Sequence, residues 1–177
     1  MPTHIGNSGK PLIAVSQCLL GDRVRYDGEV KCCADLLDFI DINFRVIAVC
    51  PEVEIGLSVP RPPVQLTGEL NNIKITGRDD PSIDITKPMQ QYCQQRPARL
   101  NSIQGYIFKS KSPSCGIKEI PIFNSDGKPV GTSQGAFARA ILQYYPNLPI
   151  TDEQGLLNRK QRDDFLHQIQ LYGQTFK

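Results

Sequence analysis

The sequence predicts an α/β fold in which helices cover both faces of a mostly parallel β-sheet, giving three layers. Short apolar runs rich in β-branched residues, typical of buried strands, alternate along the chain with segments of helical periodicity. Such alternation indicates strand–helix–strand units, which place successive strands parallel. With 177 residues, 40% of them hydrophobic, the chain is long enough for one domain with its own core.

Four short runs predict the strands of this sheet, and a fifth region predicts strands of another kind. The four runs span residues 11–18, 44–50, 105–110 and 148–153. Each has the length of a buried strand and is too short for a typical helix. Residues 64–87 instead show broken alternation around two glycines, which predicts a hairpin or irregular strands.

Helical spacing predicts four helices, at residues 31–43, 87–102, 133–146 and 158–173. Pro97 should end or kink the second helix, because proline removes a backbone donor. A serine opens the third helix and a proline closes it. The last helix is amphipathic, and its apolar positions are Phe165, Leu166, Ile169 and Leu171.

Two segments with prolines and glycines are predicted to be connections. In residues 51–63 the prolines exclude a regular element. Residues 121–131 contain the pair Asp126 and Gly127, which predicts a turn.

Residues 1–150 are expected to form the domain that binds a metal cluster, as argued below, and residues 151–177 a C-terminal helical extension. The net charge is only +2, so overall charge does not point to a polyanionic partner. The N-terminus lacks the pattern of a secretory signal, and no apolar stretch approaches the ~20 residues of a membrane span. We therefore expect a cytoplasmic protein without a membrane partner, whose six cysteines stay reduced. Its oligomeric state is not predicted by any feature of the sequence.

Three of the cysteines follow predicted strands. Cys18 ends the first run, Cys50 ends the second, and Cys115 lies five residues beyond the third. In parallel sheets ligands bind beyond the carboxyl ends of the strands, so neighbouring strands would bring these thiols to one edge. Three convergent thiolates suit a soft metal, and an iron–sulfur cluster with only three cysteines keeps one iron open. An open iron can bind a substrate atom and act as a Lewis acid.

Inert burial is the alternative for these thiols, because free cysteine is among the most buried residue types. No two cysteines have the spacing of a zinc finger or zinc ribbon. Cys32, Cys33 and Cys93 lie within predicted helices. Adjacent residues on a helix point about 100° apart, so Cys32 and Cys33 cannot both face one site. Packing is therefore the favoured role for these three.

Polar residues in the same loops are candidates for catalysis and substrate binding. Glu52 and Glu54 follow Cys50, where a carboxyl group could move a proton to or from a substrate. Nearby hydroxyls could contact a substrate or a cluster sulfide, and arginine suits planar or anionic ligands. These further candidates are Ser16, Ser112, Ser114, Arg23, Arg25, Asp27 and Arg61. Solvated charges and ordinary turn hydrogen bonds are the alternatives.

Three segments in order, SQCLLGDRVRYDG, VCPEVEIGLSVPRPP and SKSPSCG, resemble the thiouracil desulfidase (TudS) family over roughly residues 11–145. The resemblance implies a Rossmann-like α/β fold and a four-iron, four-sulfur (4Fe-4S) cluster with three protein ligands. The matching positions are Cys18, Cys50 and Cys115. It further implies that the fourth iron takes the sulfur of a thiolated pyrimidine. Water then replaces this sulfur, and hydrosulfide leaves without net redox change.

By spacing from the neighbouring cysteines, the resemblance assigns the acid/base carboxylate to Glu54 and the active-site serine to Ser112. Family loops vary between CPE-x-x-GGL and the CPEVEIGL of this chain, which keeps Glu52 as an alternative. Residues 148–173 resemble the junction to a second module in longer relatives that are linked to sulfur removal from 4-thiouridine in tRNA. The expected substrate is a thiolated base or nucleoside, with tRNA as a weaker alternative. Whether the chain is a natural single domain or part of a longer protein stays open.

Two other functions remain as alternatives. In the first, the cysteines hold a structural metal or cluster without catalysis, and Cys32 or Cys33 closes the site. In the second, a cluster-free thiol enzyme or redox sensor uses Cys18 or Cys50 as its nucleophile. Loss of metal after replacement of Cys32 and Cys33 would favour the first alternative. Alkylation-sensitive activity without visible absorption would favour the second.

Overall fold

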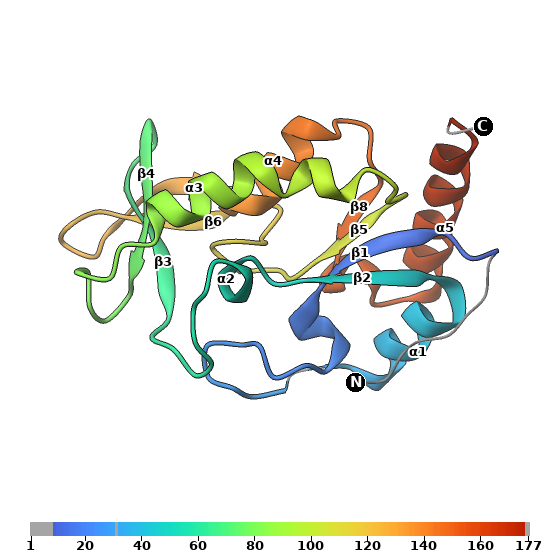
Figure 1. Ribbon diagram of the computed structural model, residues 1–177, viewed down its shortest axis with the longest axis horizontal. Helices are drawn as coiled ribbons and strands as arrows, with labels where there is room; N and C mark the ends of the chain where they lie inside the picture. Colours follow the sequence, from blue (N-terminus) through green and yellow to red (C-terminus); the bar gives the residue numbers. More distant parts are fainter. Residues whose placement is uncertain (1–8, 31, 176–177) are drawn as a thin grey trace.

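A four-stranded parallel sheet forms the centre of the computed structural model, which describes residues 9–30 and 32–175 (Figure 1). The strand order is β2-β1-β5-β8, and every neighbouring pair is parallel. The strands are β1 (Leu12–Ser16), β2 (Arg45–Val49), β5 (Tyr106–Phe108) and β8 (Ile150–Asp152). All four predicted runs are therefore strands, and the α/β class is confirmed. Most of the N-terminal segment that argues against a secretory signal lies outside the described residues.

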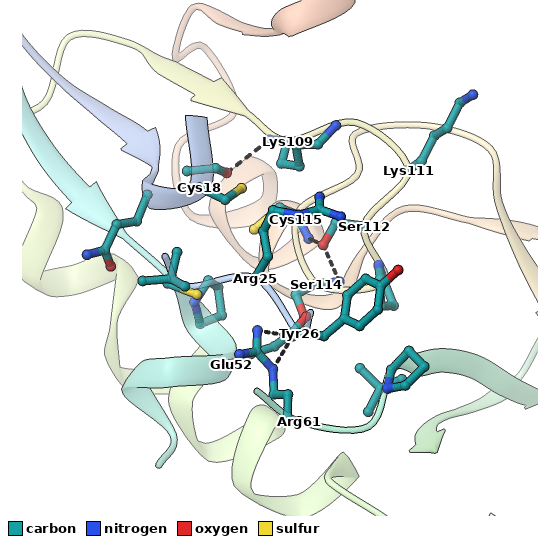
Figure 2. A pocket seen from close by; sticks show the side chains of 18 of the residues that line it. Cys18, Arg25, Tyr26, Glu52, Arg61, Lys109, Lys111, Ser112, Ser114 and Cys115 are labelled. Carbon is teal, nitrogen blue, oxygen red and sulfur yellow. Dashed lines mark hydrogen bonds and ion pairs between the residues drawn. The ribbon is translucent and has the colours of Figure 1, made fainter. Parts of the chain in front are cut away.

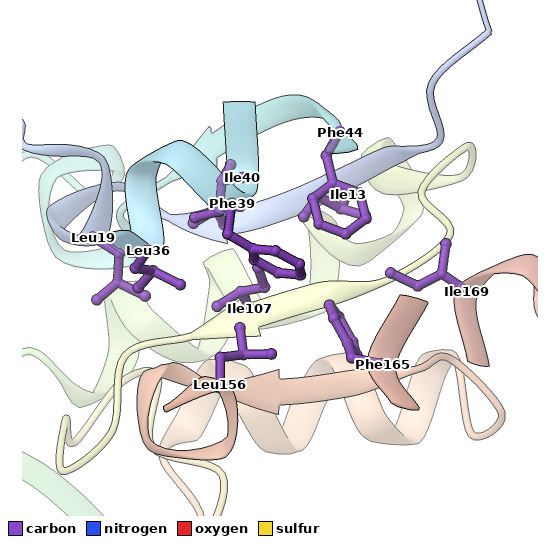
Figure 3. Packing of buried hydrophobic residues seen from close by; sticks show 11 residues of the cluster. Ile13, Leu19, Leu36, Phe39, Ile40, Phe44, Ile107, Leu156, Phe165 and Ile169 are labelled. Atoms are coloured by element: carbon purple, nitrogen blue, oxygen red, sulfur yellow. The ribbon is translucent and has the colours of Figure 1, made fainter. Parts of the chain in front are cut away.

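Helices cover both faces of this sheet. The α-helices are α1 (Ala34–Asn43), α2 (Pro51–Glu54), α3 (Thr86–Gln95), α4 (Ala136–Tyr144) and α5 (Arg159–Gln174); the 3-10 helices are η1 (Gln17–Leu20), η2 (Pro97–Leu100) and η3 (Glu153–Leu156). On one face, Phe39 of α1 and Phe165 of α5 share a core with Ile13 of β1 (Figure 3). On the other face, Phe137 of α4 lies in a second core with Tyr106 of β5. The two cores give the three predicted layers.

A second, mixed sheet lies beyond α3 and α4, on the opposite side of the molecule from α5 (Figure 1). Its strands are β3 (Val64–Glu69), β4 (Asn72–Gly77), β6 (Ile120–Phe123) and β7 (Pro129–Ser133), in the order β4-β3-β6-β7. The β3–β4 pair is the predicted hairpin. The predicted turn at Asp126 and Gly127 is also present, but it joins β6 to β7, two strands that the sequence pattern did not predict.

Two connections to helices differ from the prediction. Helix α1 begins at Ala34, so Cys32 and Cys33 lie in the loop before it and the argument from helical geometry does not apply to them. The predicted start, residue 31, lies outside the described residues. Residues 51–54 form the short helix α2, where no regular element is expected, because Pro51 occupies the first turn and has no backbone donor to lose there.

Helix α4 also begins later than expected, at Ala136. The predicted opening serine, Ser133, instead pairs with Ile120 as the last residue of β7. The first N–H groups of a helix need partners outside the helix. Here they donate to the loop that carries Cys115, since the N–H groups of Ala136 and Phe137 bind the carbonyls of Pro113 and Ser114.

The C-terminal segment is built into the main sheet and one of its cores. The expected domain boundary coincides with the start of β8, which pairs with β5. From α5, Phe165 and Ile169 are buried and Leu166 packs beside them, as the amphipathic pattern predicts. Leu171 is 51% exposed, so its inclusion on the apolar face is wrong. Within the described ranges, the structure has no helix with the length and apolar character of a membrane span.

Replacing Phe165 with alanine should lower the free energy of unfolding by about 3–5 kcal/mol, because it empties a buried aromatic site. The ring is 3% exposed and packs edge-on against Phe44, with the centroids 6.2 Å apart. Urea unfolding measures the change. Leu171→Ala is the matched control on the same helix and should change stability by less than ~0.5 kcal/mol. Equal small effects would show that α5 contributes little to the core.

Candidate functional site

Three cysteines line one cavity of about 260 Å³ at the carboxyl edge of the parallel sheet (Figure 2). Cys18 lies in η1 after β1, Cys50 directly precedes α2 after β2, and Cys115 lies in the loop after β5. Strands β2, β1 and β5 are adjacent and parallel, as the placement of the thiols requires. Of the other cysteines, Cys32 and Cys33 do not line this cavity, and Cys93 faces a second cavity between α3 and α4.

Backbone hydrogen bonds hold the loops of two of these cysteines. The hydroxyl oxygen of Ser112 accepts the N–H groups of Ser114 and Cys115, at 3.2 and 3.0 Å. The start of α4 binds the same loop from behind, where a Cβ on Gly135 would come within 2.7 Å of the carbonyl carbon of Ser114. The Cys50 carbonyl accepts the N–H of Glu54, the first hydrogen bond of α2. The thiols therefore sit on ordered backbone.

Burial keeps the three thiols protonated when no cation is bound. Burial, followed by the neighbouring Cys50, raises the pKa of Cys18 to about 11. Burial also raises the pKa of Cys50, and it raises that of Cys115 well above 9.0. Reactive cysteines in thiol enzymes have lowered pKa values, so these environments disfavour a cluster-free nucleophile. A bound metal would reverse this, because it deprotonates coordinating thiols.

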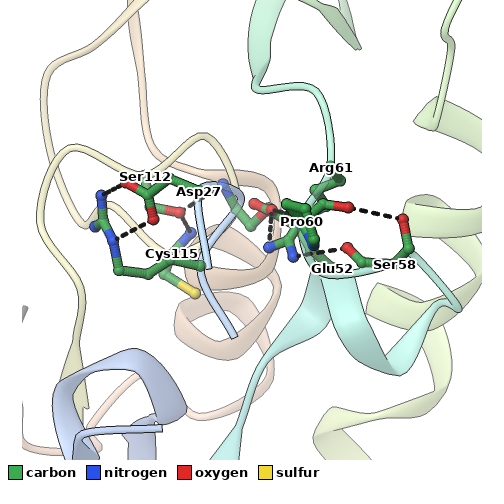
Figure 4. A network of polar contacts seen from close by, with 9 residues as sticks. Asp27, Glu52, Ser58, Pro60, Arg61, Ser112 and Cys115 are labelled. Atoms are coloured by element: carbon green, nitrogen blue, oxygen red, sulfur yellow. Dashed lines mark hydrogen bonds and ion pairs between the residues drawn. The ribbon is translucent and has the colours of Figure 1, made fainter. Parts of the chain in front are cut away.

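Glu52 is the carboxylate that faces the cavity, and both of its oxygens are held in place (Figure 4). Arg61 donates from Nε and Nη2 to Oε2, at 3.0 and 2.7 Å. The hydroxyl of Ser114, which is 1% exposed, donates to Oε1 at 2.9 Å. Because Arg61 holds one oxygen and Ser114 holds the other, the carboxylate is fixed from both sides. Three predicted candidates thus form one unit: Glu52, Arg61 and Ser114.

Glu54, the carboxylate preferred from the resemblance, is not among the residues that line the cavity. Its Oε1 accepts the backbone N–H of Cys50 at 3.3 Å. Its Oε2 accepts a hydrogen bond of 2.8 Å from Nε of Arg96, the residue directly after α3. The cause is the turn of α2, which directs the carboxylates of Glu52 and Glu54 to different neighbours. Glu52 therefore lines the cavity, whereas Glu54 links the Cys50 backbone to Arg96.

The predicted residues of the first loop separate into those that line the cavity and those that do not. Arg25 lines it, and Asp27 holds Arg25 through hydrogen bonds of 3.1 and 2.9 Å. These bonds lower the pKa of Asp27 to about 2. Asp27 is outside the cavity lining, and Arg23 is exposed and also outside it. For Asp27 and Arg23 a direct role at the site is therefore not supported by the geometry.

Lys109, Ser110 and Glu153 form a part of the site that the sequence pattern missed. Lys109 and Ser110 line the cavity just after β5. Glu153, the first residue of η3, accepts hydrogen bonds from the Lys109 ammonium and the Ser110 hydroxyl, and from the Ser110 N–H at 2.8 Å. Residue 153 is 44 positions from Lys109, so no local motif announces the contact.

Glu153→Gln should destabilise the protein at neutral pH by about 1.5–3 kcal/mol, because charge-assisted hydrogen bonds are lost. Burial raises the pKa of Glu153, but the hydrogen bonds from Lys109 and Ser110 outweigh it, so the pKa lies below 4.5. The folded pKa is lowered, so the ionised group stabilises the fold above 4.5, and this contribution disappears as the pH falls through the folded value. Unfolding curves for both proteins should therefore converge in acid. A gap independent of pH would contradict this.

The three thiols that line the cavity are soft donors, which suit iron. Within the described residues, no three histidine, cysteine or acidic side chains form a group that could hold one metal ion. The three cysteines of a cubane each bind a different iron, whereas the ligands of one ion must all lie within bonding distance of it. Three thiols that line one cavity could each bind a different iron of such a cluster.

Fold and site together define an α/β protein with a thiol-lined cavity at the edge of a parallel sheet. The chain belongs to the 2-thiouracil desulfurase family, whose model matches residues 13–153. The uncharacterized protein YbbK of Bacillus subtilis (strain 168) is 29% identical over 138 residues, which are 75% of this chain and 90% of that protein. The solved structure of the 4Fe-4S-dependent thiouracil desulfidase TudS is similar, with a TM-score of 0.64 and 29% identity over 83% of this chain and 93% of that one. The family resemblance is thereby confirmed.

Proposed function

We propose that this chain is a desulfidase that replaces the sulfur of a thiolated pyrimidine with oxygen and releases hydrosulfide. The observation that carries the proposal is the meeting of three thiols and one fixed carboxylate in a single cavity. Membership of the 2-thiouracil desulfurase family supports it, and so does the similarity to a 4Fe-4S-dependent thiouracil desulfidase.

Cys18, Cys50 and Cys115 are the proposed ligands of a 4Fe-4S cluster. Three ligands leave one iron without a protein donor. When bound, the cluster would supply a soft Lewis acid that takes the substrate sulfur and weakens the carbon–sulfur bond. The candidates for closing the site as a structural centre, Cys32 and Cys33, lie outside the cavity lining, which favours an open iron.

Glu52 is the proposed acid/base group. Its Oε2 is committed to Arg61, so the proton of an incoming water would be accepted at Oε1, where Ser114 already donates. Ser112 lines the same cavity, and its oxygen accepts two backbone N–H groups, so its own proton is free to be donated. That proton would hold a ring oxygen or nitrogen of the substrate in place.

The cavity favours a small substrate. Its volume of about 260 Å³ is below the ~300–1,000 Å³ typical of sites for drug-sized ligands. Side chains of Arg25, Lys109 and Lys111 add positive charge to its wall. We propose a thiolated base or nucleoside as the substrate, with thiolated tRNA as the weaker alternative.

The decisive experiment is anaerobic reconstitution with iron and sulfide, followed by assays with 2-thiouracil, 4-thiouracil, 4-thiouridine and thiolated tRNA. Hydrosulfide release, together with formation of the oxo product and no consumption of a reductant, is the expected result. The relative rates identify the substrate. A full cluster with no turnover of any of the four would favour the structural-cluster alternative. Turnover in a colourless, iron-free protein would favour the thiol enzyme.

A further inference from the structure

Tyr26 is the aromatic residue in the wall of the thiol-lined cavity. Among the described residues that line this cavity, no other has an aromatic side chain. Tyr26 is 39% exposed, and Figure 2 shows its ring among the side chains of the cavity wall. The cavity therefore has one flat apolar surface that the protein leaves partly uncovered.

A tight turn holds the ring of Tyr26 in place. The N–H of Gly28 donates to the carbonyl of Arg25 at 3.0 Å, and the φ of +68° at Gly28 favours glycine. The guanidinium of Arg25 lies over the Tyr26 ring, 5.5 Å from its centroid, and Asp27 holds this guanidinium with two hydrogen bonds. A cation over one face of an aromatic ring leaves the opposite face for another planar group.

The backbone of Tyr26 is also linked to the proposed acid/base group. Its carbonyl accepts the N–H of Arg61 at 2.8 Å. The side chain of Arg61 in turn holds Oε2 of Glu52. One residue thus fixes both the turn that carries the ring and the carboxylate, so their relative position is set by the protein before a substrate binds.

The serines of the same wall offer hydroxyl groups and no flat surface. The oxygen of Ser16 accepts the N–H of Lys109 at 2.9 Å, and Ser114 donates its proton to Glu52. The oxygen of Ser112 accepts two backbone N–H groups, so its proton is free for a ligand. Such a proton can bind the edge of a heterocyclic ring, whereas the face of that ring needs an aromatic partner.

We propose that the ring of Tyr26 stacks on the planar ring of the thiolated pyrimidine, which makes Tyr26 a specificity-determining residue. This inference rests on the proposed function and deepens it. Every base has a π-face, so stacking on an aromatic side chain depends little on the substituents of the ring. Tyr26 therefore selects an aromatic, planar ring, and it leaves recognition of the sulfur and of the ring edge to other groups.

The test compares the non-aromatic variants Tyr26→Leu and Tyr26→Met with Tyr26→Phe, which keeps the ring. Each protein is reconstituted anaerobically, and its iron content and urea midpoint are measured. KM and kcat are then determined with 2-thiouracil, 4-thiouracil and 4-thiouridine. Uracil and dihydrouracil serve as inhibitors, because they share their oxygens and N–H groups but only uracil has an aromatic ring.

We expect the leucine and methionine variants to keep their iron and to raise KM about tenfold or more, the usual effect of losing one stacked base. Their kcat should change little, because stacking is the same in the bound substrate and in the transition state. Uracil should lose its advantage over dihydrouracil as an inhibitor in both variants. Phenylalanine should restore most of the binding.

Tyr144→Leu is the matched control, since Tyr144 lies on α4 outside the cavity lining and is 53% exposed. It should behave as the unmodified chain. An unchanged KM in the leucine and methionine variants would overturn the proposal. An equal rise in KM with phenylalanine would assign the effect to the hydroxyl and also overturn it, as would loss of the fold or the iron in both non-aromatic variants. A cluster-loaded, unmodified protein that turns over no thiolated compound would instead refute the proposed function.

Discussion

Cys50→Ala is expected to abolish stable cluster binding and hydrosulfide release together, the largest effect predicted for any single substitution. Two remaining thiols cannot hold a four-iron cluster with the open position that the proposed chemistry needs. Cys50 directly precedes α2 and also raises the pKa of Cys18, so the two thiols share one electrostatic environment. Iron and sulfide analysis, visible absorption and the desulfidation assay measure the loss.

The matched control is the double replacement Cys32→Ser and Cys33→Ser. These residues are outside the cavity lining, so the variant should keep its iron and its turnover. Cys32 packs against the turn that follows Cys18, because its Sγ lies 3.6 Å from the position that a Cβ on Gly21 would take. Loss of metal in this variant, with Cys50→Ala retaining it, would reverse the assignment of ligands and favour a closed structural site.

The main sheet was predictable because its strands are short, apolar and separated by helices. The second sheet was only half predictable. Its β3–β4 hairpin is local, so alternation and glycine signals reveal it. Strands β6 and β7 are short, contain Pro121 and Pro129, and leave many residues exposed, and β6 joins the sheet through a distant parallel pairing with β3. Nothing in a local window encodes that pairing.

The site shows the same limit at the level of single residues. The placement of Cys18, Cys50 and Cys115 followed from the rule that parallel strands deliver their ends to one edge. The choice between Glu52 and Glu54 did not follow, because they lie two and four residues after Cys50 and only the path of α2 decides which carboxylate faces the cavity. The tail resemblance to longer relatives stays a prediction.

Glu52→Gln should leave the cluster in place and reduce turnover by about 10²–10⁴-fold, the usual contribution of a positioned acid/base group. The amide has the same shape but accepts no proton at neutral pH. The substitution also leaves Arg61 without its charged partner in a setting where its side chain is only 6% exposed, so stability should fall as well. Measuring turnover well below the unfolding midpoint separates the two effects.

Glu54→Gln is the matched comparison, because it makes the same chemical change two residues further along the same short helix. The amide oxygen can still accept the Cys50 N–H, and the pair with Arg96 that it weakens is 32% exposed on the glutamate side. Turnover should therefore stay within a few-fold of the unmodified protein. The opposite result, an inactive Glu54→Gln and an active Glu52→Gln, would contradict the assignment of Glu52. The Glu54 carboxylate would then have to turn into the cavity during the reaction. Its spacing from Cys50, and not the resting geometry, would have identified the acid/base residue.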